Sequence, residues 1–182
     1  MNSLPSAVFL DRDGTIIEDA RYLSDPDKVV LIHGAADAIS RINAALIPVI
    51  LVTNQSGIGR GYFTEAEYQR VAERLDDMLA RKSARIDAAY HCPHAPGDNC
   101  DCRKPGVGLF RQAAADHPDI DLSRSLYVGD RMRDIQPGIT LGGTAVLVPS
   151  ADTTPEDLEE AQRVARVANS LGTVIDWYLC TN

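Results

Sequence analysis

The sequence predicts an α/β fold with a doubly wound, Rossmann-like parallel sheet. Short apolar runs such as Val-Ile-Leu-Val at 49–52 alternate along the chain with longer segments in which apolar residues recur at helical spacing. A strand that is apolar at every position is buried on both faces, as parallel sheets require. Strands that alternate with helices indicate a sheet covered by helices on both sides.

The composition fits one soluble globular domain over residues 1–182. Apolar residues make up 45% of the chain and charged residues 24%, which are ordinary values. The net charge of −8 argues against binding to nucleic acid or to an anionic membrane, because both need a basic surface. It leaves room for an anionic small substrate, since a few basic side chains can converge locally.

The sequence also bears on where the protein works. The first residues lack a basic segment followed by a long apolar run, and no stretch is long enough to span a bilayer. We therefore expect no signal peptide. With four cysteines and no export signal, we expect a reduced, cytoplasmic setting. We also expect the protein to be a monomer.

Strands are expected where apolar runs are bounded by turn residues, at 8–10, 49–52, 86–90, 125–128, 144–148 and 164–168. Helices are expected at 34–46, 64–81 and 108–117, in a short segment before Gly142, from Thr154 onward and after Ser170. Loops are expected at 15–32 and 58–63. The helix at 64–81 has the clearest start, because Thr64 and Glu67 form a capping box.

Polar side chains follow three of the expected strands. They are Asp11 and Asp13 after the first, Thr53 and Asn54 after the second, and Asp130 and Asp134 after the fourth. Lys104 lies between these groups in the sequence. Parallel strands place their carboxyl ends at one edge, where open α/β sheets bind ligands, so we expect these groups to meet in one crevice. Taken alone, the segment 11–14 fits a solvated turn equally well, because Asp and Gly are common turn residues.

The clustered groups have a shared chemical meaning. Three or four carboxylates repel one another unless a cation lies among them, and hard oxygen ligands favour Mg²⁺. Lys104 and the Thr53 hydroxyl supply the positive charge and hydrogen bonds that a transferring phosphoryl group needs. The residues therefore indicate metal-assisted phosphoryl transfer.

The order of these residues resembles a known superfamily. Residues 11–15 (Asp-Arg-Asp-Gly-Thr), Thr53, Lys104 and residues 129–134 match the four motifs of the haloacid dehalogenase superfamily, over about residues 7–148. More narrowly, the segments at 53–57, 92–94 and 100–105 resemble the D-glycero-D-manno-heptose-1,7-bisphosphate 7-phosphatases. The histidinol-phosphate phosphatases share the same features.

The resemblance implies a mechanism and roles for the motif residues. Asp11 would attack phosphorus and form an aspartyl-phosphate, while Asp13 would protonate the leaving alkoxide and then activate water. Mg²⁺ would be held by the carboxylates of Asp11 and Asp130 and by the backbone carbonyl of Asp13. The remaining roles are phosphoryl binding by Thr53 and Lys104, and orientation of Lys104 or of the metal's water shell by Asp134.

A second metal site is suggested by a cluster of cysteines and histidine. The set comprises Cys92, His94, Cys100 and Cys102. Four thiolate and imidazole ligands suit a closed structural Zn²⁺ site, although the spacing is not that of a common zinc finger. Free cysteines are the alternative, and a disulfide fits poorly with a reduced compartment. The resemblance favours Zn²⁺, with His91 and Cys180 as non-ligands.

Neither gap after the first two motifs has room for a bulky cap domain, so we expect the capless form of the fold with a zinc-binding loop. Loops at 19–22 and 55–60 and the zinc loop would shape the pocket.

The resemblance implies substrate contacts at Asp19, Ala20, Arg21, Tyr22, Asn54, Gln55, Ser56, Arg60, Arg103 and Arg131. Arg103 is the best candidate for a second phosphate, because guanidinium binds phosphate bidentately. A surface ion pair is the alternative for Arg103.

The sequence departs from the heptose-phosphatase pattern at two places. Arg131 stands where lysine is expected, and Gly-Val-Gly at 106–108 replaces His/Leu-Pro-Gly. Both leave the phosphatase chemistry intact and put the substrate in doubt.

The first interpretation is a Mg²⁺-dependent phosphatase that removes the 7-phosphate from heptose 1,7-bisphosphate, for ADP- or GDP-heptose and hence lipopolysaccharide or capsule. Histidinol-phosphate phosphatase is the alternative within the class, followed by another small sugar-phosphate phosphatase. A phosphotransferase or mutase is disfavoured, because an open site admits water. A nucleic-acid 3′-phosphatase is disfavoured by the charge, and a non-catalytic zinc module by the intact motifs.

Overall fold

The structure of the protein is a computed structural model that describes residues 4–179. Residues 1–3, part of the segment in which no export signal is expected, lie outside the described residues, as does Cys180. None of the helices within 4–179 is both long enough and apolar enough to cross a bilayer.

The predicted parallel sheet is confirmed. Its strands are β1 (Val8–Leu10), β2 (Val49–Asn54), β3 (Ala88–Cys92), β4 (Leu126–Gly129), β5 (Thr144–Leu147) and β6 (Arg166–Val167). They are all parallel and run in the order β3-β2-β1-β4-β5-β6. The chain winds outward from β1 in one direction through β3 and in the other through β6, so the topological switch point lies between β1 and β4.

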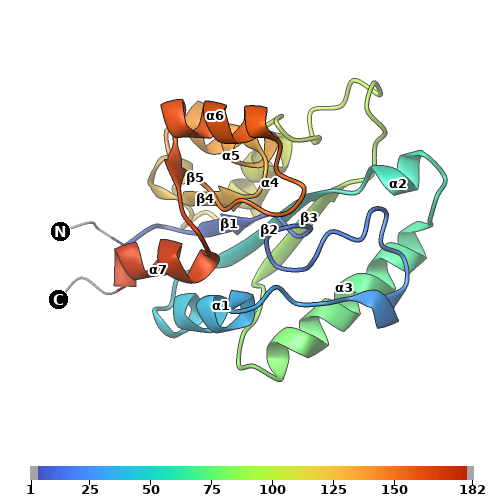
Figure 1. The fold of residues 1–182 in the computed structure, drawn as a ribbon, viewed down its shortest axis with the longest axis horizontal. Coiled ribbons are helices and arrows are strands. Elements are labelled where there is room, and N and C mark those ends of the chain that lie inside the picture. Colours follow the sequence, from blue (N-terminus) through green and yellow to red (C-terminus); the bar gives the residue numbers. More distant parts are fainter. Residues whose placement is uncertain (1–3, 180–182) are drawn as a thin grey trace.

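Helices cover both faces of the sheet (Figure 1). They are α1 (Ala35–Ala44), α2 (Ser56–Gly59), α3 (Glu65–Ala80), α4 (Gly108–Asp116), α5 (Met132–Thr140), α6 (Pro155–Val164) and α7 (Leu171–Leu179), with 3-10 turns at Pro26–Lys28 and Leu122–Arg124. In Figure 1, α1, α3 and α7 lie on one side of the sheet and α4, α5 and α6 on the other.

The alternation of side chains along β1 shows how this layering arises. Val8 and Leu10 belong to the core cluster that contains residues of α1, α3 and α7. Phe9, between them, points to the other face and packs with Phe110 of α4 and with Tyr127 of β4. A strand with apolar residues on both faces can only be buried between two layers of helices, as the continuous apolar runs predict.

Several element boundaries differ from the sequence prediction by a few residues. The third strand lies at 88–92 rather than 86–90, because the backbone and side chain of Asp87 pair with Val49 at the strand's start. The glycine-rich segment expected to be a loop contributes a short helix, α2, which begins at Ser56. The last strand is shorter than expected, because Val164 still belongs to α6.

The predicted capping box at the start of α3 is confirmed. The Thr64 hydroxyl accepts from the Glu67 amide at 3.2 Å, and the Glu67 carboxylate accepts from the Thr64 amide at 2.7 Å. The box gives the Thr64 amide an acceptor and adds a side-chain acceptor to the Glu67 amide, which also contacts the Thr64 carbonyl at 3.1 Å. These contacts fix where α3 begins, immediately after the loop that borders the site.

Replacing Thr64 by Ala is expected to lower the free energy of unfolding by ~1 kcal/mol, because the Glu67 amide loses its side-chain acceptor. Urea denaturation measures the change. Thr140→Ala is the control, since the Thr140 hydroxyl only donates to the Gln136 carbonyl within α5 and caps nothing. Equal destabilisation by the two substitutions would contradict the capping role.

Candidate active site

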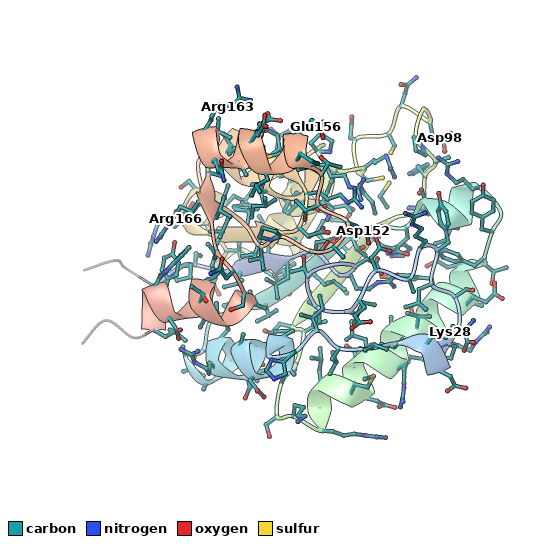
Figure 2. All side chains as sticks on the ribbon, viewed as in Figure 1. Lys28, Asp98, Asp152, Glu156, Arg163 and Arg166 are labelled. Atoms are coloured by element: carbon teal, nitrogen blue, oxygen red, sulfur yellow. The ribbon has the colours of Figure 1, made fainter. Side chains whose placement is uncertain are left out.

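The carboxyl ends of the central strands bring the motif residues together. Asp11 follows β1, Thr53 is the second-to-last residue of β2, and Asp130 follows β4. Lys104 comes from the long segment between β3 and α4 and is buried among them. Two loops border this edge of the sheet, one containing Asp98 between β3 and α4 and one containing Asp152 after β5, both labelled in Figure 2. The expectation that these groups meet at one edge is therefore met.

Lys104 is the centre of the buried cluster. Its Nζ atom lies 2.6 Å from Asp11 Oδ1 and 2.8 Å from Asp134 Oδ1, and it donates to the Val52 carbonyl at 2.7 Å. The ammonium therefore has three acceptors, which is its full donor capacity. The contact with Asp134 gives that residue a direct orienting position on the lysine.

Burial sets the electrostatics of this cluster. It raises the pKa of the Asp11 carboxyl to about 7, and the nearby Lys104 ammonium offsets only part of the rise. Burial likewise raises the pKa of Asp130 to about 6, with Asp134 as a further cause. Burial alone would lower the pKa of Lys104, but Asp11 and Asp134 together raise it. The lysine thus stays charged, while the raised pKa values of Asp11 and Asp130 show that negative charge on these two carboxylates is only partly compensated by the protein's own cations.

The carboxylates form a set that fits a divalent cation. One oxygen from each of Asp11, Asp130 and Asp134 lies within 4.8 Å of the others. Three buried carboxylates against one lysine are the donor set and charge that a hard cation requires. The side chain of Asp13 turns elsewhere, to Gln55 and to the neighbouring Arg12.

Asp130 is held by two hydroxyls that the sequence analysis missed. Ser150 Oγ donates to Asp130 Oδ2 at 2.6 Å, and Thr153 Oγ1 donates to the Asp130 backbone carbonyl at 2.6 Å. Both hydroxyls come from the loop after β5, next to β4 in the sheet. Their position after a strand end is the same signal that identified the other site residues.

Gln55 and Asn54 connect the active-site segments to one another. Gln55 Nε2 donates to Asp13 Oδ2 and to Thr53 Oγ1, at 2.9 Å each. Asn54 Nδ2 donates to the Lys104 carbonyl at 3.1 Å, and its Oδ1 accepts from the Lys104 amide at 2.9 Å. Two residues predicted as substrate contacts thus also fix the geometry of three motif residues.

A cavity of about 460 Å³ opens beside these groups. Its lining includes Asp13 and every predicted substrate residue except Ala20 and Arg131. Those lining residues are Asp19, Arg21, Tyr22, Asn54, Gln55, Ser56, Arg60 and Arg103. Pro96, from the loop between β3 and α4, also lines it.

The cavity gathers positive charge in a protein of net charge −8. Five arginines line it: Arg12, whose charge is paired with Asp13, and four others, Arg21, Arg60, Arg103 and Arg133. Arg133 was not predicted. Arg131, which was, stands at the start of α5, where its backbone amide donates to Asp134, and Arg133 in the first turn of the helix lines the cavity instead. The Arg103 side chain donates to the His94 carbonyl at 3.4 Å, so the surface ion pair considered for it is not what the structure shows.

The predicted metal set of cysteines and histidine also assembles. One atom from each of Cys92, His94, Cys100 and Cys102 lies within 4.8 Å of the others. The three cysteines are free, with sulfur atoms separated by 3.1 Å or more, so no disulfide joins them. His91 lies apart from this set and pairs with Glu65 at 2.9 Å.

The comparisons with known proteins agree with this site. The HAD-hydrolase-like family model matches residues 101–174. A probable D-glycero-D-manno-heptose-1,7-bisphosphate 7-phosphatase of Thermoplasma volcanium is 43% identical over 124 residues, which cover 68% of this chain and 84% of the relative. The D-glycero-beta-D-manno-heptose-1,7-bisphosphate 7-phosphatase of Escherichia coli K12 is 39% identical over 163 residues, 85% of each chain. This chain belongs to the heptose-bisphosphate phosphatase family of haloacid dehalogenase-like hydrolases.

A solved structure supports the family assignment. The crystal structure of D,D-heptose 1.7-bisphosphate phosphatase from B. bronchiseptica, complexed with magnesium and phosphate, superposes with a TM-score of 0.86 at 33% identity. The match covers 94% of this chain and 97% of that chain. The resemblance inferred from the motifs and the fold class of the haloacid dehalogenase superfamily are therefore confirmed.

Gly14 is required by both its conformation and its neighbour. Its φ is +83°, and a Cβ atom there would overlap the Asp130 carboxylate. Gly14→Ala is expected to destabilise the protein by about 1–3 kcal/mol, from backbone strain and displacement of Asp130. Gly34→Ala is the matched control, because Gly34 has φ +80° but no atom within 4 Å of the added Cβ. A cost no larger than that of the control, measured by urea denaturation, would contradict the close approach.

Proposed function

We propose that this protein removes the 7-phosphate from D-glycero-D-manno-heptose 1,7-bisphosphate, in the synthesis of ADP- or GDP-heptose for lipopolysaccharide or capsule. The observation that carries the proposal is a phosphatase cluster beside an arginine-lined cavity. Asp11, Lys104 and Asp134 supply the reacting end, and four arginines supply positive charge for a second anionic group. The relatives named above bear this activity in their names.

The reaction follows from the positions of the two aspartates. Asp11 attacks phosphorus and forms an aspartyl-phosphate, and its short contact with Lys104 favours the ionised, nucleophilic carboxylate and orients it. Asp13, at the edge of the cavity, gives its proton to the departing alkoxide and then takes one from water. Thr53 and Lys104 bind the phosphoryl oxygens.

Mg²⁺ is the proposed cofactor. The carboxylates of Asp11 and Asp130 and the backbone carbonyl of Asp13 would hold it, with Asp134 acting through Lys104 or the water shell. When bound, the ion neutralises charge between the anionic nucleophile and the anionic phosphoryl group. The fit rests on three buried carboxylates with a single lysine among them.

The cavity charge separates the proposed substrate from the alternative. Histidinol phosphate carries one phosphate and a cationic amine, and the arginines of the lining outnumber its two carboxylates, Asp13 and Asp19, so the cavity disfavours a further cation. A sugar bisphosphate carries a second phosphate, which Arg103 and its neighbours can bind bidentately. We therefore rank the bisphosphate above histidinol phosphate. Ala20 and Arg131 are the substrate positions with the least support, since neither lines the cavity.

Phosphate release with Mg²⁺ tests this ranking on three substrates, the α and β anomers of heptose 1,7-bisphosphate and histidinol phosphate. We expect one heptose anomer to have the highest kcat/KM, and Asp11→Asn to lower its kcat roughly 10³-fold or more without unfolding the protein. Circular dichroism checks the fold of the variant. A higher kcat/KM on histidinol phosphate would overturn the substrate, and full activity of Asp11→Asn would overturn the mechanism.

We also propose that Cys92, His94, Cys100 and Cys102 bind a structural Zn²⁺ ion. The support is their mutual approach and the lack of disulfides among them. The loop they close leads into Arg103 and Lys104, so the ion would hold the catalytic lysine and a cavity arginine in place. We further propose a cytoplasmic monomer that binds neither nucleic acid nor membrane. Zinc–thiolate chemistry supports the reduced compartment, and the net charge of −8 argues against anionic partners.

Zinc analysis and thermal melting test the site. Cys92→Ser is expected to lose the metal and more than about 2 kcal/mol of stability, which corresponds to roughly 4–8 °C in Tm. Cys180→Ser, the remaining cysteine of the chain, serves as the control and should keep one zinc per protein. Equal zinc content in the two variants would remove Cys92 from the ligand set.

A further inference from the structure

Arg12 lies between the two motif aspartates and has no role in the mechanism described above. Its side chain is only 1% exposed, whereas that of Asp13 is 21% exposed. A buried guanidinium is costly unless charged or polar partners satisfy it. The partners of Arg12 therefore indicate why the charge is placed there.

The Arg12 guanidinium forms hydrogen bonds with both carboxylate oxygens of Asp13. Arg12 Nε donates to Oδ2 at 3.2 Å, and Nη2 donates to Oδ1 at 3.1 Å. This bidentate fork fixes the plane of the carboxylate as well as its position, which a single donor cannot do.

The same guanidinium positions a second active-site residue. Arg12 Nη2 also donates to Gln55 Oε1 at 3.1 Å, which leaves the Gln55 amide nitrogen free to donate to Asp13 and Thr53. Arg12 therefore sets the spacing between the proton-transferring carboxylate and the hydroxyl proposed to bind the phosphoryl group.

The aromatic ring of Tyr68 also contacts the Arg12 guanidinium. The guanidinium carbon lies 5.5 Å from the centre of the Tyr68 ring, within the range of a cation–π contact. Tyr68 is buried on α3, and its ring packs on His91 of β3 with 4.2 Å between centroids. The guanidinium thus lies between the Tyr68 ring of α3 and the Asp13 carboxylate, with contacts to both.

We propose that Arg12 is a positioning residue that holds Asp13 in line for proton transfer to the leaving group. The proposal rests on the role of Asp13 given above. As the bond between Asp11 and phosphorus forms and the bond to the leaving oxygen breaks, the Asp13 proton moves to that oxygen. In the second half, Asp13 takes a proton from water as the water oxygen bonds to phosphorus and the aspartyl bond breaks. Arg12 stays protonated throughout and touches neither reacting bond.

The test compares two esters of similar size that differ in their need for a proton. The leaving group of benzyl phosphate is a basic alkoxide, which needs a proton from a general acid. The leaving group of 4-nitrophenyl phosphate is a stable phenolate, which does not. The measured quantity is kcat/KM, which reports steps up to the phosphoenzyme. Arg12→Met is expected to lower kcat/KM for benzyl phosphate roughly 10- to 100-fold and that for 4-nitrophenyl phosphate less than about 3-fold.

A conservative variant and a control complete the design. Arg12→Lys keeps the charge but not the fork, so we expect a smaller loss with the same selectivity for benzyl phosphate, and this variant carries the test if Arg12→Met does not fold. Arg85→Met removes an arginine that pairs with Asp87 at the surface and should leave both rates unchanged. In an Asp13→Asn background, Arg12→Lys should no longer change the ratio of the two rates.

Equal losses on the two esters would show that Arg12 only maintains the fold, and unchanged rates would show that Asp13 is positioned without it. Either result overturns the proposal. Neither ester is a sugar, so the test does not depend on the heptose substrate. Failure to hydrolyse heptose 1,7-bisphosphate alongside selective loss on benzyl phosphate would overturn the proposed substrate alone.

Discussion

The ion pairs and hydrogen bond of the Lys104 ammonium tie the active site together. The lysine enters from a long connection yet contacts Asp11 after β1, the Val52 carbonyl in β2 and Asp134 in α5. A buried ammonium without partners would cost several kcal/mol, so the lysine cannot occupy this place unless all three acceptors are present. The position of one side chain therefore makes two strands, a helix and a loop interdependent.

The topology of the sheet makes that convergence possible. β1 lies between β2 and β4, and these are the strands whose ends carry Thr53 and Asp130. The two halves of the sheet wind outward in opposite directions from β1 and β4, and a crevice is expected outside the carboxyl ends of the strands at this switch point. The hydroxyls of Ser150 and Thr153 reach Asp130 from β5, one strand further out. The neighbouring strand thus orients a carboxylate that belongs to the centre.

Site residues could be predicted from the sequence where a local pattern marked them, and not where long-range contacts or helix orientation decided their position. Asp11, Thr53 and Asp130 follow short apolar runs, so the rule that parallel strands end at one edge was enough to bring them together. The choice of Arg133 over Arg131 at the cavity was beyond reach, because it depends on where α5 begins and which way its first turn faces. The third strand was displaced because the pairing of Asp87 with Val49 involves residues 38 apart in sequence.

The role of Gln55 illustrates a different limit. Its position after a strand marked it as a substrate contact, yet its amide also bridges Asp13 and Thr53. A sequence pattern can place an amide at a site, but it does not say which of its donors are already engaged. The same applies to Asn54, whose side-chain amide donates to the Lys104 carbonyl and accepts from the Lys104 backbone amide.

In the loop that carries the cysteine and histidine cluster, the residues that line the cavity are separate from those that anchor Lys104. Residues 95–99 lie between the two pairs of clustered residues, and Pro96 among them lines the cavity. Lys104 is anchored beyond the cluster, by Asn54 and by its own ion pairs. Insertions or substitutions within 95–99 can therefore reshape the substrate rim while the lysine stays in place. Descendants of such a chain could change what they hydrolyse without having to reinvent how they hydrolyse it.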